Sequence, residues 1–209
     1  MYKPYALADR TIQVLQKYAI KRFEKHKANI RLAKFDELNV IEEASLLYTE
    51  LDKATRKVFR ELFIAVYTNA VTEDESEDTV DELAEICITE ILDNPHRLTH
   101  MTYSAEILRK RDYMSEAVNS VTSKADKQME MDKALRLWSQ MIGWYTDFVE
   151  ISAHTQALIK SGVKRVRWNA QEDEKVCREC EELDGEEFDI GAIPDIPLHL
   201  NCRCYLTAV

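Results

Sequence analysis

Glycine is absent from the first 142 residues of this chain, and its four glycines are Gly143, Gly162, Gly185 and Gly191. Glycine weakens a helix interior by about 1 kcal/mol, so a long stretch without it is typical of helical sequence. The sequence therefore predicts a mainly α protein whose character changes after Gly162. Of its 209 residues, 1–161 are expected to form a helical region, a bundle or array of long helices, and 162–209 a small α+β domain.

Two segments carry apolar residues at the three- and four-residue spacing that lines one face of a helix: Ile12, Leu15, Ala19, Phe23 and Ile30, and Leu51, Ala54, Val58, Leu62 and Ala65. A third helix is expected to bury Leu83, Ile86 and Ile91. One face of a fourth, long helix is traced by Ala134, Trp138, Met141, Tyr145, Phe148, Ser152, Thr155 and Ile159. Asp36 is the expected N-cap of the second helix, and the third is expected from about Thr79 to Leu92. The fourth should end at Gly162, because glycine suits the left-handed position after a helix.

The sequence after Gly162 reads differently. VKRVRWNA alternates like a strand, VCRECEELDG resembles a knuckle followed by a short helix and a turn, and CRCYLTAV resembles a closing strand. A segment of about 48 residues with few large apolar side chains cannot hold a compact fold by burial alone. An additional stabilising element is therefore expected.

Four of the five cysteines lie in the last 33 residues. Cys177 and Cys180 form C-x2-C, and after 18 intervening residues His199, Cys202 and Cys204 form H-x2-C-x-C. Two such pairs from separate segments are typical of a tetrahedral zinc site, and metal binding can contribute on the order of 10 kcal/mol to folding. We predict a structural Zn²⁺ ion bound by Cys177, Cys180, His199 and Cys202, with Cys204 as the alternative fourth ligand.

Other chemistries of the cysteine cluster stay open at this point. The two pairs could form disulfides outside the cytosol, or the C-x2-C could be a redox motif, although that motif is usually set in a thioredoxin-like sheet. A catalytic zinc would need an open position and a base such as Glu181, Glu182 or Asp184, whereas five candidate ligands for four positions favour a closed site. The sequence contains no phosphate loop, GxGxxG, G-x-S-x-G or HExxH motif, so we expect no enzyme activity. Cys87 is expected in the core.

The net charge and its distribution along the sequence limit which partners are expected. The net charge of −10 argues against a protein that coats nucleic acid, but residues 1–34 alone carry +7. The candidate contact residues for nucleic acid or a partner are Lys17, Lys21, Arg22 and Lys25 in this basic start and Lys164, Arg165 and Arg167 near the cysteines. A solvated helix face or strand edge is the simpler interpretation of both. No apolar run is long enough for a membrane span and no signal peptide is recognisable, so we expect cytosolic synthesis and no membrane partner.

The C-terminal residues also occur in a recognisable order. A helix ending in glycine is followed by a strand with a tryptophan, an aspartate before C-x2-C, a Leu-Asp-Gly turn with a nearby phenylalanine, and a closing Pro…His…Cys-Arg-Cys. These are Gly162, Trp168, Asp173, Cys177, Cys180, Leu183, Asp184, Gly185, Phe188, Pro197, His199, Cys202, Arg203 and Cys204. The segment, about residues 145–209, resembles the C-terminal signature of the phage Mu F-like minor head proteins, the head morphogenesis family.

The resemblance implies a virion component associated with the portal vertex of the head and present in few copies. It implies action in procapsid assembly, in the host cytoplasm, and in some members in DNA packaging or delivery. The expected partners are then the portal protein, the capsid and the packaged DNA. The alternative function is a zinc-finger nucleic-acid-binding module, in which Lys160 would extend the basic strip of Lys164, Arg165 and Arg167.

Overall fold

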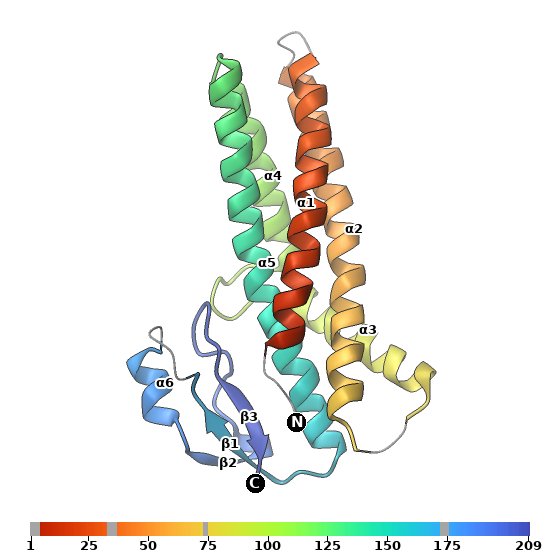
Figure 1. The fold of residues 1–209 in the computed structure, drawn as a ribbon, viewed down its shortest axis with the longest axis vertical. Coiled ribbons are helices and arrows are strands. Elements are labelled where there is room, and N and C mark those ends of the chain that lie inside the picture. The colour runs from red at the N-terminus through yellow and green to blue at the C-terminus, as the bar shows by residue number, and fades with distance from the viewer. Residues whose placement is uncertain (1–4, 33–36, 73–74, 172–175) are drawn as a thin grey trace. The chain divides into compact units, whose positions relative to one another are not determined.

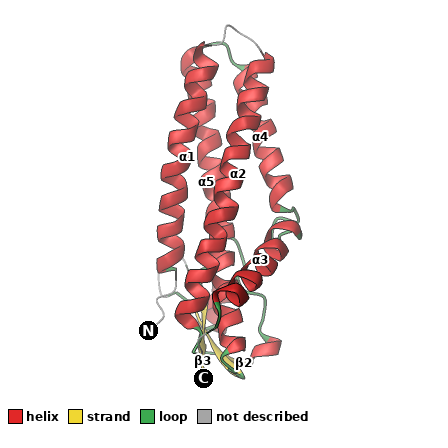
Figure 2. Ribbon diagram, turned by 90° about the vertical axis from the view of Figure 1, so that its right-hand side faces the viewer, coloured by secondary structure: helices red, strands yellow, loops and turns green. Residues whose placement is uncertain are grey.

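The computed structural model describes residues 5–32, 37–72, 75–171 and 176–209. This part of the chain is mainly helical, with a small sheet and a short helix in its last third, as Figures 1 and 2 show. The predicted fold class is therefore confirmed. The predicted N-cap Asp36 and the signature residue Asp173 lie outside the described residues.

Five long helices precede the sheet: α1 (Ala6–Leu32), α2 (Glu37–Ala70), α3 (Glu77–Asp93), α4 (Tyr103–Ser120) and α5 (Lys124–Lys160). Helix α4 was not predicted, although Thr102 is a good N-cap and its hydroxyl accepts the N–H of Ala105 at 3.2 Å.

Two apolar residues predicted on buried helix faces are exposed in the structure. Ile86 is 50 % exposed because α3 buries the face of Val80, Ala84 and Ile91, and Ile86 lies on the other side. Ile159 is 48 % exposed in the last turn of α5. Apolar spacing identified both helices but not the direction in which every side chain points.

The structure divides into two compact units. Residues 11–58 and 92–143 form the bundle unit, in which segments of α1, α2, α4 and α5 run alongside one another (Figure 1). Side-chain contacts join them pairwise: His26 with Glu43, Arg56 with Ser104, Tyr113 with Glu130, and Lys27 with Asp132. Tyr48, Leu51, Met114 and Trp138 are among its buried residues. This unit is a four-helix bundle.

The other compact unit, which we call the sheet unit, contains residues 1–10, 59–91 and 144–209. Its sheet has β1 (Arg165–Asn169) in the middle, antiparallel to β2 (Glu187–Asp189) on one side and to β3 (Tyr205–Ala208) on the other. Helix α6 (Arg178–Leu183) lies between β1 and β2 in the sequence. The core cluster of this unit consists of Leu158, Val166, Trp168, Cys180, Cys202, Cys204 and Leu206.

Helix α5 ends as predicted and leads directly into the sheet. Gly162 has a φ of +73°, and the N–H groups of Gly162 and Val163 donate to the carbonyls of Ile159 and Leu158 at 3.0 and 3.1 Å. This pair of bonds is the Schellman motif, which satisfies the last carbonyls of a helix and needs a residue tolerant of positive φ. Six residues before the last residue of α5, the Nε2–H of His154 donates to the carbonyl of Leu206 in β3 at 3.0 Å.

Residues 162–209 all belong to the sheet unit, together with segments of α1, α2, α3 and α5. The boundary expected at residue 161 comes from the change in composition, and it stays a prediction.

Candidate metal centre

The five predicted ligand residues come from two segments of the sheet unit. Cys177 is the N-cap of α6, and its sulfur accepts the backbone N–H of Cys180 at 3.4 Å. His199, Cys202 and Cys204 come from the segment that leads into β3. The ligand atoms of Cys177, Cys180 and His199 lie within 4.8 Å of one another, and so do those of Cys180, Cys202 and Cys204. These groups can hold a metal ion, and Cys180 belongs to both.

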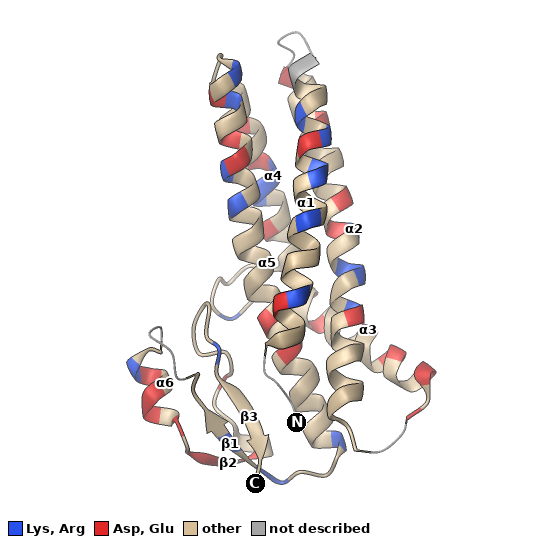
Figure 3. Ribbon diagram, viewed as in Figure 1, with Lys and Arg blue, Asp and Glu red and all other residues tan. Residues whose placement is uncertain are grey.

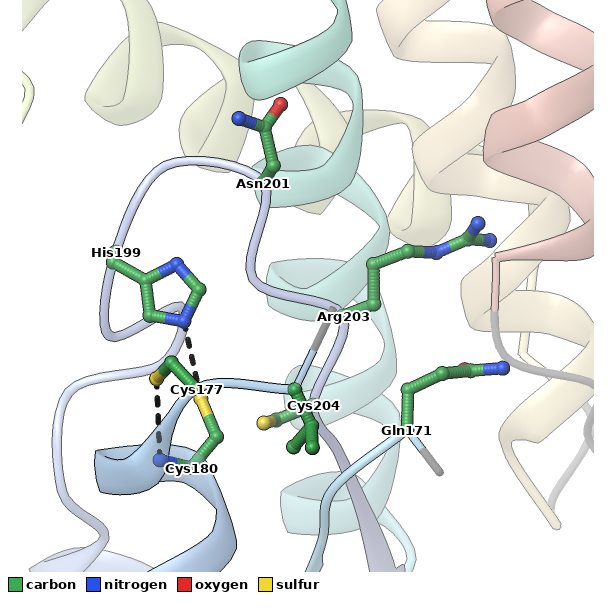
Figure 4. Close-up of a pocket in the computed structure, with 8 residues that line it drawn as sticks. Gln171, Cys177, Cys180, His199, Asn201, Arg203 and Cys204 are labelled. Atoms are coloured by element: carbon green, nitrogen blue, oxygen red, sulfur yellow. Dashed lines mark hydrogen bonds between the residues drawn. The ribbon is translucent and has the colours of Figure 1, made fainter. Parts of the chain in front are cut away.

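The distance between the sulfurs of Cys180 and Cys202 fits tetrahedral coordination. The sulfur of Cys180 lies 3.7 Å from that of Cys202. It also lies 3.2 Å from Nε2 of His199 (Figure 4). With metal–sulfur bonds of about 2.3 Å, two thiolates of a tetrahedral zinc site are about 3.8 Å apart. The sulfur–sulfur distance therefore suits two vertices of such a site.

The imidazole of His199 is oriented for ligation. Its Nδ1 lies 3.0 Å from the carbonyl oxygen of Leu200. Because a carbonyl can only accept, Nδ1 carries a proton, and in the neutral imidazole the lone pair of Nε2 faces Cys180. A histidine ligand that donates its other N–H to a carbonyl is the usual arrangement around a bound metal. The donor set thus fits a metal ion in both residue types and tautomer.

Two sulfurs compete for the fourth position. Cys204 lines a cavity of about 40 Å³ together with Cys177, Cys180 and His199 (Figure 4). Cys202 lies at tetrahedral distance from Cys180. Cys202 and Cys204 are both buried and both within the cluster. The choice between them, with Cys202 named first, stays a prediction.

The thiol groups differ in acidity. A hydrogen bond from Cys204 lowers the pKa of Cys202 to about 5, and the same bond raises the pKa of Cys204. Burial raises the pKa of Cys180 to about 12. At neutral pH the cluster therefore holds protons that a metal would displace, so metal affinity should rise with pH.

The turn between His199 and Cys202 depends on a residue that the sequence analysis did not single out. Asn201 has a φ of +64°, a conformation that asparagine tolerates better than most residues. Its side-chain oxygen accepts the indole N–H of Trp144 in α5 at 3.1 Å, and the N–H of Cys202 donates to the carbonyl of His199 at 3.1 Å. Asn201 and Trp144 thus fix the loop that presents two ligands. In the sequence, this role of Asn201 is indicated only by its position between two predicted ligands, His199 and Cys202.

Two residues of the Leu-Asp-Gly turn have local structural roles. The carboxylate of Asp184 accepts the N–H of Ala170 at 2.7 Å. Gly185 has a φ of +79°, and its N–H donates to the carbonyl of Trp168 at 2.9 Å. The turn thereby joins the end of α6 to β1.

Most of the predicted basic contact residues already have acidic partners. Arg165 and Arg167 both pair with Glu187, at 3.2 and 2.8 Å, while Lys164 is exposed. In the bundle unit Arg22 and Lys25 both pair with Glu50. The remaining two predicted residues of α1, Lys17 and Lys21, are exposed and have no ion pair within the described residues. Figure 3 shows the basic residues along α1 and the acidic ones on α3, α6 and β2.

Because Arg165 and Arg167 of β1 pair with Glu187, we expect these two arginines to contribute little to DNA binding. Each phosphate contact contributes about 0.9 to the slope of log affinity against log salt concentration. Because Glu187 offsets part of the charge of Arg165 and Arg167, their joint replacement by glutamine should change that slope by less than about 0.9, the value for a single contact. Fluorescence anisotropy with duplex DNA at several salt concentrations measures it. The charge-matched control is Lys17→Gln with Lys21→Gln, and a change of about 1.8 for the arginine pair would contradict the expectation.

Comparison of the chain with models of protein families, with curated proteins and with solved structures gave no match. None of the helices in the described ranges combines the length and the apolar run that crossing a bilayer requires.

Proposed function

We propose that this chain is a non-enzymatic phage minor head protein, and that a structural Zn²⁺ ion holds its C-terminal segment together. The proposal starts from the resemblance of residues 145–209 to the head morphogenesis signature. The observation that supports it best is the position of the signature residues. Trp168, Cys180, Cys202 and Cys204 share one buried cluster, and Leu183 and Phe188 pack against it.

Zinc is the metal that these ligands favour. Thiolates and an imidazole at tetrahedral spacing are the usual donors of structural zinc sites. Cys180, Cys202 and Cys204 are each only 2 % exposed, which suits a closed site better than one that admits water and substrate. Two of the three candidate bases have other contacts, since Asp184 accepts the Ala170 N–H and Glu182 pairs with Arg178 at 2.9 Å, while Glu181 is exposed. The ion would therefore act as a structural element.

In this proposal the protein joins the head in the host cytoplasm, at the portal vertex, in few to several copies. Its partners are the portal protein and the capsid. Contact with packaged DNA would be local and weak because of the net charge of −10. Lys17 and Lys21 are the best candidates for that contact or for a protein partner, since both are exposed in α1.

The test is incorporation into procapsids of the phage or prophage that encodes the chain. We expect quantitative mass spectrometry of purified procapsids to find this protein at a few copies per particle, together with the portal protein. Cys180→Ser should reduce incorporation strongly, because it removes a ligand common to both groups, whereas Cys87→Ser should not, because Cys87 lies in α3 outside the cluster. Absence of the wild-type protein from procapsids would refute the proposed role.

The alternative, a zinc-finger nucleic-acid-binding module, has less support. Its basic strip is offset by Glu187, and Lys160 pairs with Glu75. The salt titration described above distinguishes the two functions. Strong DNA binding that disappears when Arg165 and Arg167 are neutralised would favour the alternative.

A further inference from the structure

Residues 5–9, far from the cysteine cluster in sequence, contact the segment that carries Cys204. The hydroxyl of Tyr5 donates to the carbonyl oxygen of Cys204 across 199 positions of the sequence. The guanidinium of Arg203 lies 4.8 Å from the centre of the Tyr5 ring, and it also donates to the carboxylate of Asp9 at 3.1 Å. One side of the ligand segment is thus held by Tyr5 and Asp9.

Residues 5–9 are themselves held firmly. Glu150 of α5 is 1 % exposed, and its carboxylate accepts the N–H groups of Tyr5 and Ala8 at 2.5 and 2.7 Å. These are two of the N–H groups that the start of a helix leaves without partners, and a carboxylate there is stabilised by the helix dipole. Tyr5 is 1 % exposed, and Tyr5 and Ala8 pack with Ile151 of α5.

Tyr5 also has a backbone conformation that only the surrounding contacts explain. Its φ is +64°, a left-handed value that is unfavourable for a residue with a side chain. Residues in such conformations persist when their surroundings fix them, and they concentrate at functional sites. The contacts around Tyr5 include those to Glu150, to Ile151 and to the Cys204 segment.

We propose that Tyr5 and Asp9 are positioning residues of the metal centre: through the Cys204 carbonyl and Arg203 they hold the ligand segment in place before the metal binds. This inference rests on the proposed metal site. A segment already ordered when the ion arrives loses less conformational entropy on binding. Because such coupling is reciprocal, metal binding must also stabilise the docking of residues 5–9.

Tyr5→Phe tests the proposal, because it keeps the ring and removes only the hydroxyl. We expect its affinity for Zn²⁺, measured by competition with a chromophoric chelator, to fall about tenfold, the lower end for loss of a hydrogen bond outside the ligands. One ion per chain should still bind at saturation, which separates a positioning role from general unfolding. The matched control is Tyr18→Phe, since Arg22 lies 4.8 Å over the Tyr18 ring in the bundle unit.

Hydrogen exchange supplies the reciprocal measurement on the wild-type protein. The N–H groups of Tyr5 and Ala8 should exchange faster after zinc is removed by a chelator, and slow again when zinc is returned. This inference would be overturned if Tyr5→Phe bound Zn²⁺ as tightly as the wild type, or if the exchange rates of residues 5–9 were the same with and without zinc. Either result would leave the metal site intact. A wild-type protein that binds no zinc would instead overturn both this inference and the metal site.

Discussion

Replacing Cys180 by serine is expected to abolish metal binding and to unfold the segment from β1 to β3. Cys180 is the cysteine common to both ligand groups, so its loss leaves neither group complete. Metal binding and folding are one equilibrium in such sites, and the metal can contribute on the order of 10 kcal/mol. The remaining apolar cluster, which includes Val166, Trp168 and Leu206, is too small to replace that contribution.

Two measurements on the same sample check this expectation. Native mass spectrometry should show one zinc per chain in the wild type and none in Cys180→Ser. Hydrogen exchange should show lost protection of the amides of β1 and β3, while the helices of the bundle unit stay protected. Cys87→Ser is the matched control, because it also removes a buried thiol but lies outside the cluster. A Cys180→Ser protein with zinc bound and β1 still protected would refute the metal centre as described.

Single replacements of Cys202 and Cys204 then identify the fourth ligand. The variant that loses the metal marks the ligand, and the variant that keeps it marks a neighbour that only hydrogen-bonds within the cluster.

Trp168→Ala is expected to be the most destabilising apolar substitution near the metal centre, at about 3–5 kcal/mol of unfolding free energy. Trp168 is fully buried in the central strand β1, opposite Leu206 of β3, and it shares a cluster with Cys180. Truncation there leaves a cavity in a core with few other large side chains. Urea unfolding of the zinc-saturated protein, followed by hydrogen exchange at β1, measures the change.

Ile159→Ala is the control for this substitution, because Ile159 is 48 % exposed at the end of α5 and should cost no more than about 0.5 kcal/mol. A loss below about 1 kcal/mol for Trp168→Ala would mean that the metal, and not the apolar cluster, supplies nearly all the stability of the sheet.

The sequence was most informative where the determinants are local. A stretch of 142 residues without glycine and the spacing of Leu15, Ala19 and Phe23 identify helix, and Gly162 marks where α5 ends. The candidate ligand residues could also be predicted from the sequence, because all five lie between residues 177 and 204 and their types and spacing suit one metal.

What the sequence did not reveal depends on long-range packing. Helix α4 buries Glu106 and Lys110 beside its apolar residues, so apolar spacing alone does not mark it. The side of α3 that is exposed at Ile86 depends on what this helix packs against. Strand β2 has only three residues and forms because β1 lies beside it. Nothing near Tyr5 in the sequence points to Cys204, since the hydrogen bond between them closes a loop of 199 residues.

The discontinuous make-up of the two units has a consequence for biosynthesis. The bundle unit needs only residues 11–58 and 92–143, so it can begin to fold while later residues are still being added by the ribosome. The sheet unit combines residues 1–10 and 59–91 with 144–209, so its early segments must wait for the late ones. Until Cys204 and β3 have been synthesised, the hydrogen bond from the Tyr5 hydroxyl to the Cys204 carbonyl cannot form. If the cluster binds a metal as proposed, its metal centre is completed late, after the chain has been translated as far as Cys204.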